Sequence, residues 1–146
     1  MPPTSSTKVV IVLVVLVLIS LAVFSLSKRS HYNQRHPILD QIKENFALID
    51  PKYRNIPLQV GDSSYTEDKE VITLCLTDPT TNKYYDMNTL LYVAFHELAH
   101  VISKNEGHGD EFKENFARLL RMAAEKGIYD PSKPIPSTYC KVKTGM

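Results

Sequence analysis

The sequence predicts an α+β domain preceded by one strongly apolar N-terminal segment. Residues 56–60 and 71–77 have the apolar and β-branched composition of strands, and a polar turn region separates them. Segments with helical periodicity flank this strand pair on both sides. The 146 residues leave room for one compact domain and an appendage. A strand pair flanked by a few helices is typical of the α+β class.

The apolar segment, residues 9–26, is 18 residues long and carries no charge. As a helix it would be about 27 Å long, close to the roughly 30 Å hydrocarbon core of a bilayer. We therefore expect a transmembrane helix over residues 9–27 that anchors the chain to a lipid bilayer, after an N-terminal tail of residues 1–8. Cleavage as a signal peptide is the alternative, because Ser25-Leu26-Ser27 resembles a small-x-small cleavage site.

The charges beside the segment predict its orientation. Lys28, Arg29 and Arg35 follow it, whereas Lys8 precedes it. The positive-inside rule then predicts a single-pass membrane protein with its C-terminal domain in the cytoplasm.

The overall charge and the cysteines exclude other classes. A net charge of +1 gives no case for binding nucleic acid. Two cysteines, Cys75 and Cys140, are too few for a disulfide framework or a four-cysteine zinc site. We do not expect a bridge between them, because nothing else indicates an oxidising compartment.

The first half of the domain follows a polar linker over residues 28–36. Pro37 suits the first position of a helix, where its missing N–H is no loss, and Asp50-Pro51 ends that helix. The strands over residues 56–60 and 71–77 follow.

In the second half, Asp86 or Asn88 is placed to cap a long helix that ends near Ser103. The next helix begins near Gly109-Asp110, and Gly127 is placed to stop it. The domain is expected over residues 37–130. Residues 131–146 contain prolines and are expected to be irregular or wrapped over the surface.

The long helix carries the motif His96-Glu97-Leu98-Ala99-His100. Two histidines four residues apart lie on one helix face and can bind the same metal ion. Zn²⁺ in catalytic sites has three protein ligands and one open position for water, and His108 is the natural third ligand. This HExxH pattern is typical of zinc metallopeptidases, with Glu97 as the general base that acts on a water activated by the zinc.

The motif and the segment that follows it, Glu106-Gly107-His108-Gly109-Asp110-Glu111-Phe112, resemble the SprT-like and WLM groups of zincin metallopeptidases. The resemblance covers residues 85–127. It implies a minimal zincin fold, with a small antiparallel sheet packed on the active-site helix and the following helix. It also implies one Zn²⁺, a protein or peptide substrate, and an edge strand over residues 71–77 that pairs with the substrate. The chain lacks the four-cysteine ribbon that often accompanies SprT proteins, so a role in repair of DNA–protein crosslinks does not follow.

Alternative metal ligands stay open at this stage. Glu106 offers a carboxylate in place of His108, and Glu111 or Glu114 would serve in a gluzincin-like pattern.

Other side chains have weaker claims to a role. Tyr84, Tyr85 or Tyr92 is a candidate for stabilising an oxyanion. Cys75 is a candidate cleft residue, Cys140 a candidate zinc cap, and His31 and His36 are expected in a solvated linker.

The expected function is therefore a membrane-anchored zinc metallopeptidase. The alternatives are a secreted zinc peptidase, if the apolar segment is cleaved, and a non-catalytic, zinc-stabilised adaptor tethered to a membrane.

Overall fold

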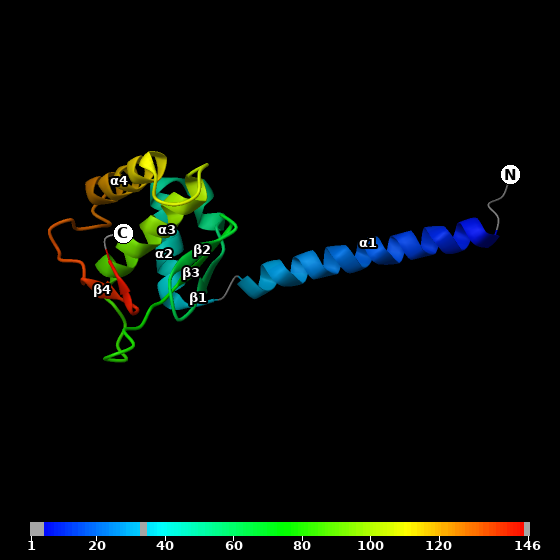
Figure 1. The fold of residues 1–146 in the computed structure, drawn as a ribbon, viewed down its shortest axis with the longest axis horizontal. Coiled ribbons are helices and arrows are strands. Elements are labelled where there is room, and N and C mark those ends of the chain that lie inside the picture. The colour runs from blue at the N-terminus through cyan, green and yellow to red at the C-terminus, as the bar shows by residue number, and fades with distance from the viewer. Residues whose placement is uncertain (1–4, 33–34, 145–146) are drawn as a thin grey trace. The chain divides into compact units, whose positions relative to one another are not determined.

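The computed structural model of the chain describes residues 5–32 and 35–144 and divides into two units near residue 33. The N-terminal unit is a single helix, and the C-terminal unit is an α+β domain, as the sequence predicts (Figure 1). The domain is not built on the antiparallel sheet that was expected, because its sheet is mixed.

Helix α1, Ser5–Tyr32, contains the predicted membrane segment. Its large apolar side chains from Val9 to Leu26 are all exposed, by 46–68%. The part Ser5–Leu26 is long and apolar enough to cross a membrane, a test that a signal sequence also passes. Most of the predicted linker is helical, because lysine and arginine are good helix formers and no proline occurs between Pro3 and Pro37. Residues 1–4 of the predicted tail and residues 33–34 of the linker lie outside the described residues.

Helix α2, Pro37–Ile49, begins and ends where the sequence predicts. The Nδ1 atom of His36 accepts a hydrogen bond from the N–H of Ile38 and caps the helix, so His36 orders the start of the domain. A 3₁₀ turn, Pro51–Asn55, follows. The buried face of α2 contributes Leu39, Ile42 and Phe46 to the core, where Phe46 packs against Phe95.

The sheet has three strands in the order β1-β3-β2. Strands β1 (Leu58–Val60) and β3 (Val71–Leu74) were predicted and run parallel, with Leu58 opposite Ile72. Strand β2 (Tyr65–Glu67) was not predicted and pairs antiparallel with β3. Strand β3 is therefore the central strand, and the expectation that residues 71–77 form the edge beside the active-site helix is wrong.

The predicted strand over residues 71–77 also ends early. Its last three residues leave the sheet, where the N–H of Cys75 donates a hydrogen bond to Ser64 Oγ. An isolated bridge between Thr77 and Tyr84 then closes the following turn.

Helix α3, Met87–Ile102, packs against β2, β3 and helix α4 (Figure 1). Helix α4, Asp110–Glu125, begins after Gly109 as predicted and buries Phe112, Leu119 and Ala123. Gly127, with φ of 69°, ends it by adopting a left-handed conformation that glycine tolerates best. These contacts enclose α3 and fix the helix that carries the HExxH motif.

The C-terminal segment belongs to the domain. It forms a hairpin of β4 (Thr138–Tyr139) and β5 (Val142–Lys143), and Cys140 in its turn is bonded to Cys75. Asn88 on α3 holds the start of this segment through two hydrogen bonds with the backbone of Asp130. Residues 131–137 are irregular, as was expected of the C-terminal tail, whereas the hairpin over residues 138–143 was not predicted.

Asp86→Ala should lower the free energy of unfolding by about 1–2 kcal/mol, because Asp86 caps α3. Its carboxylate accepts hydrogen bonds from the N–H and the hydroxyl of Thr89, and Thr89 is fully buried. Asp86→Asn keeps a capping oxygen and should lower the free energy of unfolding by a smaller amount. Denaturant unfolding of the full chain in mild detergent, followed by near-UV circular dichroism, measures both variants, and an unchanged Asp86→Ala midpoint would contradict the cap.

Candidate metal centre

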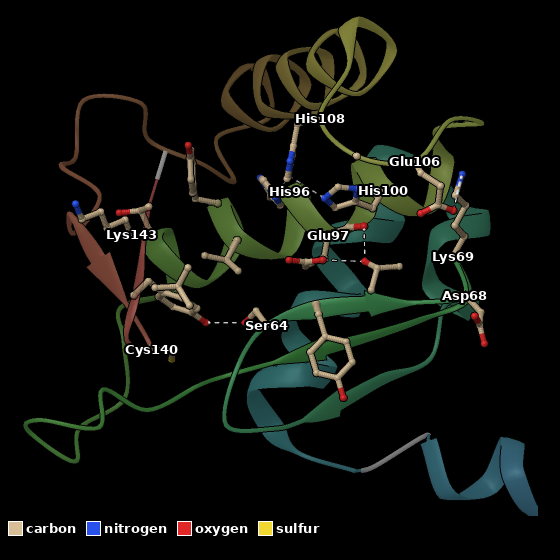
Figure 2. A pocket seen from close by; sticks show the side chains of 18 of the residues that line it. Ser64, Asp68, Lys69, His96, Glu97, His100, Glu106, His108, Cys140 and Lys143 are labelled. Carbon is tan, nitrogen blue, oxygen red and sulfur yellow. Dashed lines mark hydrogen bonds and ion pairs between the residues drawn. The ribbon is translucent and has the colours of Figure 1, made fainter. Parts of the chain in front are cut away.

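Three imidazoles from two elements converge beside α3. His96 and His100 lie one turn apart on the helix, and His108 lies in the loop between α3 and α4 (Figure 2). The Nε2 atom of His108 is 3.1 Å from Nε2 of His96 and 3.2 Å from Nε2 of His100. Two imidazole nitrogens that share a tetrahedral zinc ion should be about 3.3 Å apart. The donor set and its spacing therefore fit one zinc ion.

The other predicted ligands do not join this group. Among the described residues, the three histidines are the one set of His, Cys, Asp and Glu side chains whose ligand atoms lie within 4.8 Å of one another. Glu106 lies 3.8 Å from the Lys69 ammonium, with a side chain that is 94% exposed. Glu111 accepts hydrogen bonds from the loop backbone, and Glu114 is exposed.

Phe112 packs against all three imidazoles. Its ring centroid lies 4.9 Å from that of His96, 4.3 Å from His100 and 4.7 Å from His108. Burial, with a smaller contribution from the other two histidines, lowers the pKa of His96 to about 4. Burial and the charge of His108 also lower the pKa of His100. Both rings are therefore neutral at pH 7 and can bind a metal without first losing a proton.

The loop that presents His108 is held from two sides. The Glu111 carboxylate accepts hydrogen bonds from the N–H groups of Lys104 and Asn105, at 3.1 Å each. The Lys69 ammonium donates to the carbonyls of residues 103, 104 and 105. Gly107 has φ of 78°, a conformation that glycine adopts without strain. These contacts fix the position of His108 relative to α3.

Glu97 points from α3 toward β2 and is 6% exposed. Its Oε2 atom accepts a 2.8 Å hydrogen bond from the hydroxyl of Thr66 in β2. Burial raises the pKa of Glu97 to about 7, although the Thr66 hydrogen bond opposes this rise. A carboxyl group with a pKa near neutrality can both accept and donate a proton at physiological pH.

These side chains lie in a cleft of about 480 Å³. Its walls come from β2 and the following turn, from α3, from the His108 loop and from the C-terminal hairpin. Figure 2 shows Lys69 and Glu106 on one side of the imidazoles and Lys143 and Cys140 on the other. The cleft therefore contains the three imidazoles and Glu97 between two walls.

The two cysteines differ from their predicted roles. They form a disulfide, with side chains that are 5% and 4% exposed, so neither is a free thiol and Cys140 is not a zinc cap. The prediction against a bridge is wrong because residues 75 and 140, far apart in sequence, are brought to a Cα separation of 6.4 Å by the packing of the hairpin.

The three candidate tyrosines lie in different surroundings, and only one of them lines the cleft. Tyr84 is 62% exposed and does not line the cleft. The hydroxyl of Tyr85 accepts a hydrogen bond from the N–H of Cys140. Tyr92 lines the cleft and packs edge-on against Phe116. His31 lies in the part of α1 whose side chains fall outside the description.

Sequence analysis missed Thr66, Lys69 and Tyr139. Thr66 and Lys69 belong to a hairpin whose turn residues, Asp68 and Lys69, both have positive φ without the Asn-Gly signal that would predict such a turn. Tyr139 reaches the cleft only through the folding back of the C-terminal segment.

The chain is similar to three viral proteins. Uncharacterized protein 042R of Invertebrate iridescent virus 3 is 41% identical over 90 residues, which are 62% of this chain and 57% of that protein. Uncharacterized protein 136R of Invertebrate iridescent virus 6 is 41% identical over 87 residues, 58% of this chain and 49% of that protein. Uncharacterized protein R325 of Acanthamoeba polyphaga mimivirus is 36% identical over 112 residues, 75% of this chain and 56% of that protein.

The chain spans about half the length of these curated relatives. No family model matches it, and no solved structure matches it. What the fold and the site define is an α+β domain with three convergent histidines and a buried glutamate in one cleft.

His108→Ala should weaken zinc binding by at least about 100-fold. Mutation of a residue that only hydrogen-bonds to a metal ligand already lowers metal affinity by about 10–100-fold, and loss of a ligand itself should cost more. Glu106→Ala is the matched control from the same loop and should bind zinc as the wild type does. Competition with a chromophoric chelator measures both affinities. Equal affinities for wild type and His108→Ala would remove His108 from the ligand set.

Proposed function

We propose that the chain is a membrane-anchored zinc metallopeptidase of the SprT-like or WLM zincin type. The observation that carries this proposal is the meeting of three Nε2 atoms at zinc-ligand spacing beside the buried carboxyl group of Glu97. The α+β fold and the apolar N-terminal helix support it.

The proposed ligands are His96, His100 and His108, with Glu97 as the catalytic residue. When bound, the zinc ion would lower the pKa of a water molecule toward about 7 and polarise the substrate carbonyl. The Glu97 carboxylate takes the proton from the attacking water and later delivers it to the leaving amine. Thr66 holds this carboxylate toward the cleft through its 2.8 Å hydrogen bond.

The substrate of this proposal is an extended peptide. Strand β2 pairs with β3 on one side, and its residues Tyr65 and Thr66 line the cleft. A peptide added along the other edge of β2 would run past Glu97 and the imidazoles. The strand proposed to pair with the substrate is therefore β2, because β3 lies at the centre of the sheet.

A non-catalytic zinc adaptor explains the site less well. A structural zinc site closes its fourth position with a protein ligand and needs no general base. Here Glu97 is buried beside the ligands, at the cost of a raised pKa, and faces an open cleft.

The disulfide favours a compartment other than the cytoplasm. Disulfides persist in oxidising environments and are rare in the cytosol. Both sulfur atoms of the Cys75–Cys140 bridge are in nearly fully buried residues, which is typical of a structural bridge. We therefore propose that the domain faces an oxidising compartment, either anchored by α1 or released by cleavage after it. The charges beside α1 predict the opposite side, and experiment decides between the two.

Glu97→Gln should keep its zinc and lose cleavage by a factor of about 10²–10⁴, the usual contribution of a general base. Quenched fluorescent peptides measure cleavage, and metal analysis of the same sample measures zinc. A chelator should abolish wild-type cleavage, and added zinc should restore it. Full activity in the Glu97→Gln variant would disprove the assigned base.

Alkylation with a maleimide polymer tests the compartment. Lysates that contain the full chain are denatured under alkylating conditions. If the bridge forms in the cell, Cys75 and Cys140 should react with the maleimide polymer only after reduction. Cys75→Ala, which leaves one thiol, is the positive control and should label without reduction. Labelling of both wild-type cysteines without reduction would favour the cytoplasmic orientation, and N-terminal sequencing separates the anchored from the cleaved form.

A further inference from the structure

The C-terminal hairpin forms one complete wall of the cleft. Five of its residues line the cleft: Tyr139, Cys140, Val142, Lys143 and Thr144. Figure 2 shows Cys140 and Lys143 of this hairpin on the side of the imidazoles opposite Lys69 and Glu106. A substrate that binds along β2 must therefore pass this wall.

The wall is fastened to the rest of the domain at several points. The Cys75–Cys140 disulfide joins its turn to the end of β3. The hydroxyl of Tyr139 donates to the carbonyl of Cys75, and the hydroxyl of Tyr85 accepts from the N–H of Cys140. The rings of Tyr85 and Tyr139 stack with centroids 4.5 Å apart. The backbone that carries Lys143 is thus held in place before any ligand binds.

The turn of the hairpin depends on these attachments. Cys140 and Lys141 have φ of 45° and 70°, in the left-handed region that is unfavourable for residues other than glycine. The disulfide and the hydrogen bond from the N–H of Cys140 to Tyr85 hold this turn in place.

The charges at the two sides of the cleft differ. The ion pairs found among the described residues involve Lys52, Arg54 and Lys69 and do not include Lys143. On the opposite side, the Lys69 ammonium is occupied by backbone carbonyls, whereas the Glu106 carboxylate is almost fully exposed. The hairpin wall therefore presents a lysine that makes none of these ion pairs, whereas the other wall presents an exposed carboxylate whose ion-pair partner, Lys69, lies 3.8 Å away.

We propose that the disulfide-fastened hairpin is the substrate-recognition wall of the cleft and that Lys143 selects peptides with an acidic side chain facing that wall. This rests on the proposed peptidase function. The disulfide contributes by holding Lys143 in position, and Glu106 disfavours the same acidic side chain on the other side.

The test compares Lys143→Glu with Lys141→Glu in the full chain. Lys141 is exposed in the same turn and does not line the cleft, so both variants change the net charge equally. The probes are quenched peptides of one length in which a single position is scanned with Glu, Gln or Lys. Lys143→Glu should shift the ratio of Glu-peptide to Lys-peptide cleavage toward lysine by about tenfold at low salt, and high salt should reduce the shift. Lys141→Glu should change it less than about twofold. Equal shifts in both variants would overturn the proposal.

A second comparison isolates the disulfide. Cys75→Ala/Cys140→Ala should keep the zinc content of the wild type, because the metal ligands lie on α3 and the following loop. The preference of this double variant for acidic peptides should fall to the level measured for the Lys143→Gln variant, which lacks the charge. A preference equal to that of the wild type would show that the disulfide does not hold the wall.

Binding to the Glu97→Gln chain separates failure of this proposal from failure of the peptidase assignment. The same peptides, without the quencher, are titrated by fluorescence anisotropy. If the wild type cleaves nothing but Glu97→Gln binds acidic peptides through Lys143, the recognition wall stands and the peptidase is wrong. If cleavage occurs without dependence on Lys143, the peptidase stands and the wall is wrong. If no peptide is cleaved or bound, both are wrong.

Discussion

The convergence of three imidazole nitrogens on one point is the constraint on which the rest of the structure depends. Two of the nitrogens come from α3, and the third must be brought back to it by a loop. The Nε2 atom of His108 lies 3.1 and 3.2 Å from the Nε2 atoms of His96 and His100, and one cation could accept lone pairs from all three nitrogens at once. Phe112 lies against all three rings and excludes water from that side. Burial lowers the pKa of His96 and of His100, and neutral imidazoles are the form that binds a metal.

Two hydrogen-bonded supports keep the third imidazole in place. Lys69 and Glu111 both bond to the backbone just before His108, one from the sheet side and one from α4. Because Lys69 follows β2 directly, the strand that supports Glu97 through Thr66 also supports the loop of the third ligand. One hairpin therefore supports both Glu97 and the loop that carries His108, although these belong to different elements.

The C-terminal segment adds a covalent constraint to this arrangement. The Cys75–Cys140 bond joins the end of the central strand to the hairpin that faces the metal centre. Tyr139 fills the space between them, and burial raises the pKa of its hydroxyl to about 12, so it stays a neutral hydrogen-bond donor. A domain with a small mixed sheet gains from such a bridge, which closes a loop of 65 residues and restricts the unfolded chain. The bridge fixes the shape of the cleft along with the fold.

The sequence alone determined the features that depend on local pattern. The apolar run, the caps of α2 and α3, the start of α4 and the candidate ligands follow from charge, periodicity and residue spacing, which act within a few residues. Strand β2, the central place of β3, the Lys69 support and the bridge to Cys140 were decided by the tertiary structure alone. Each of these joins residues at least 30 positions apart or depends on turns whose residues carry no glycine or asparagine signal. Long-range packing determined these features, because the local sequence pattern is compatible with several strand orders and loop positions.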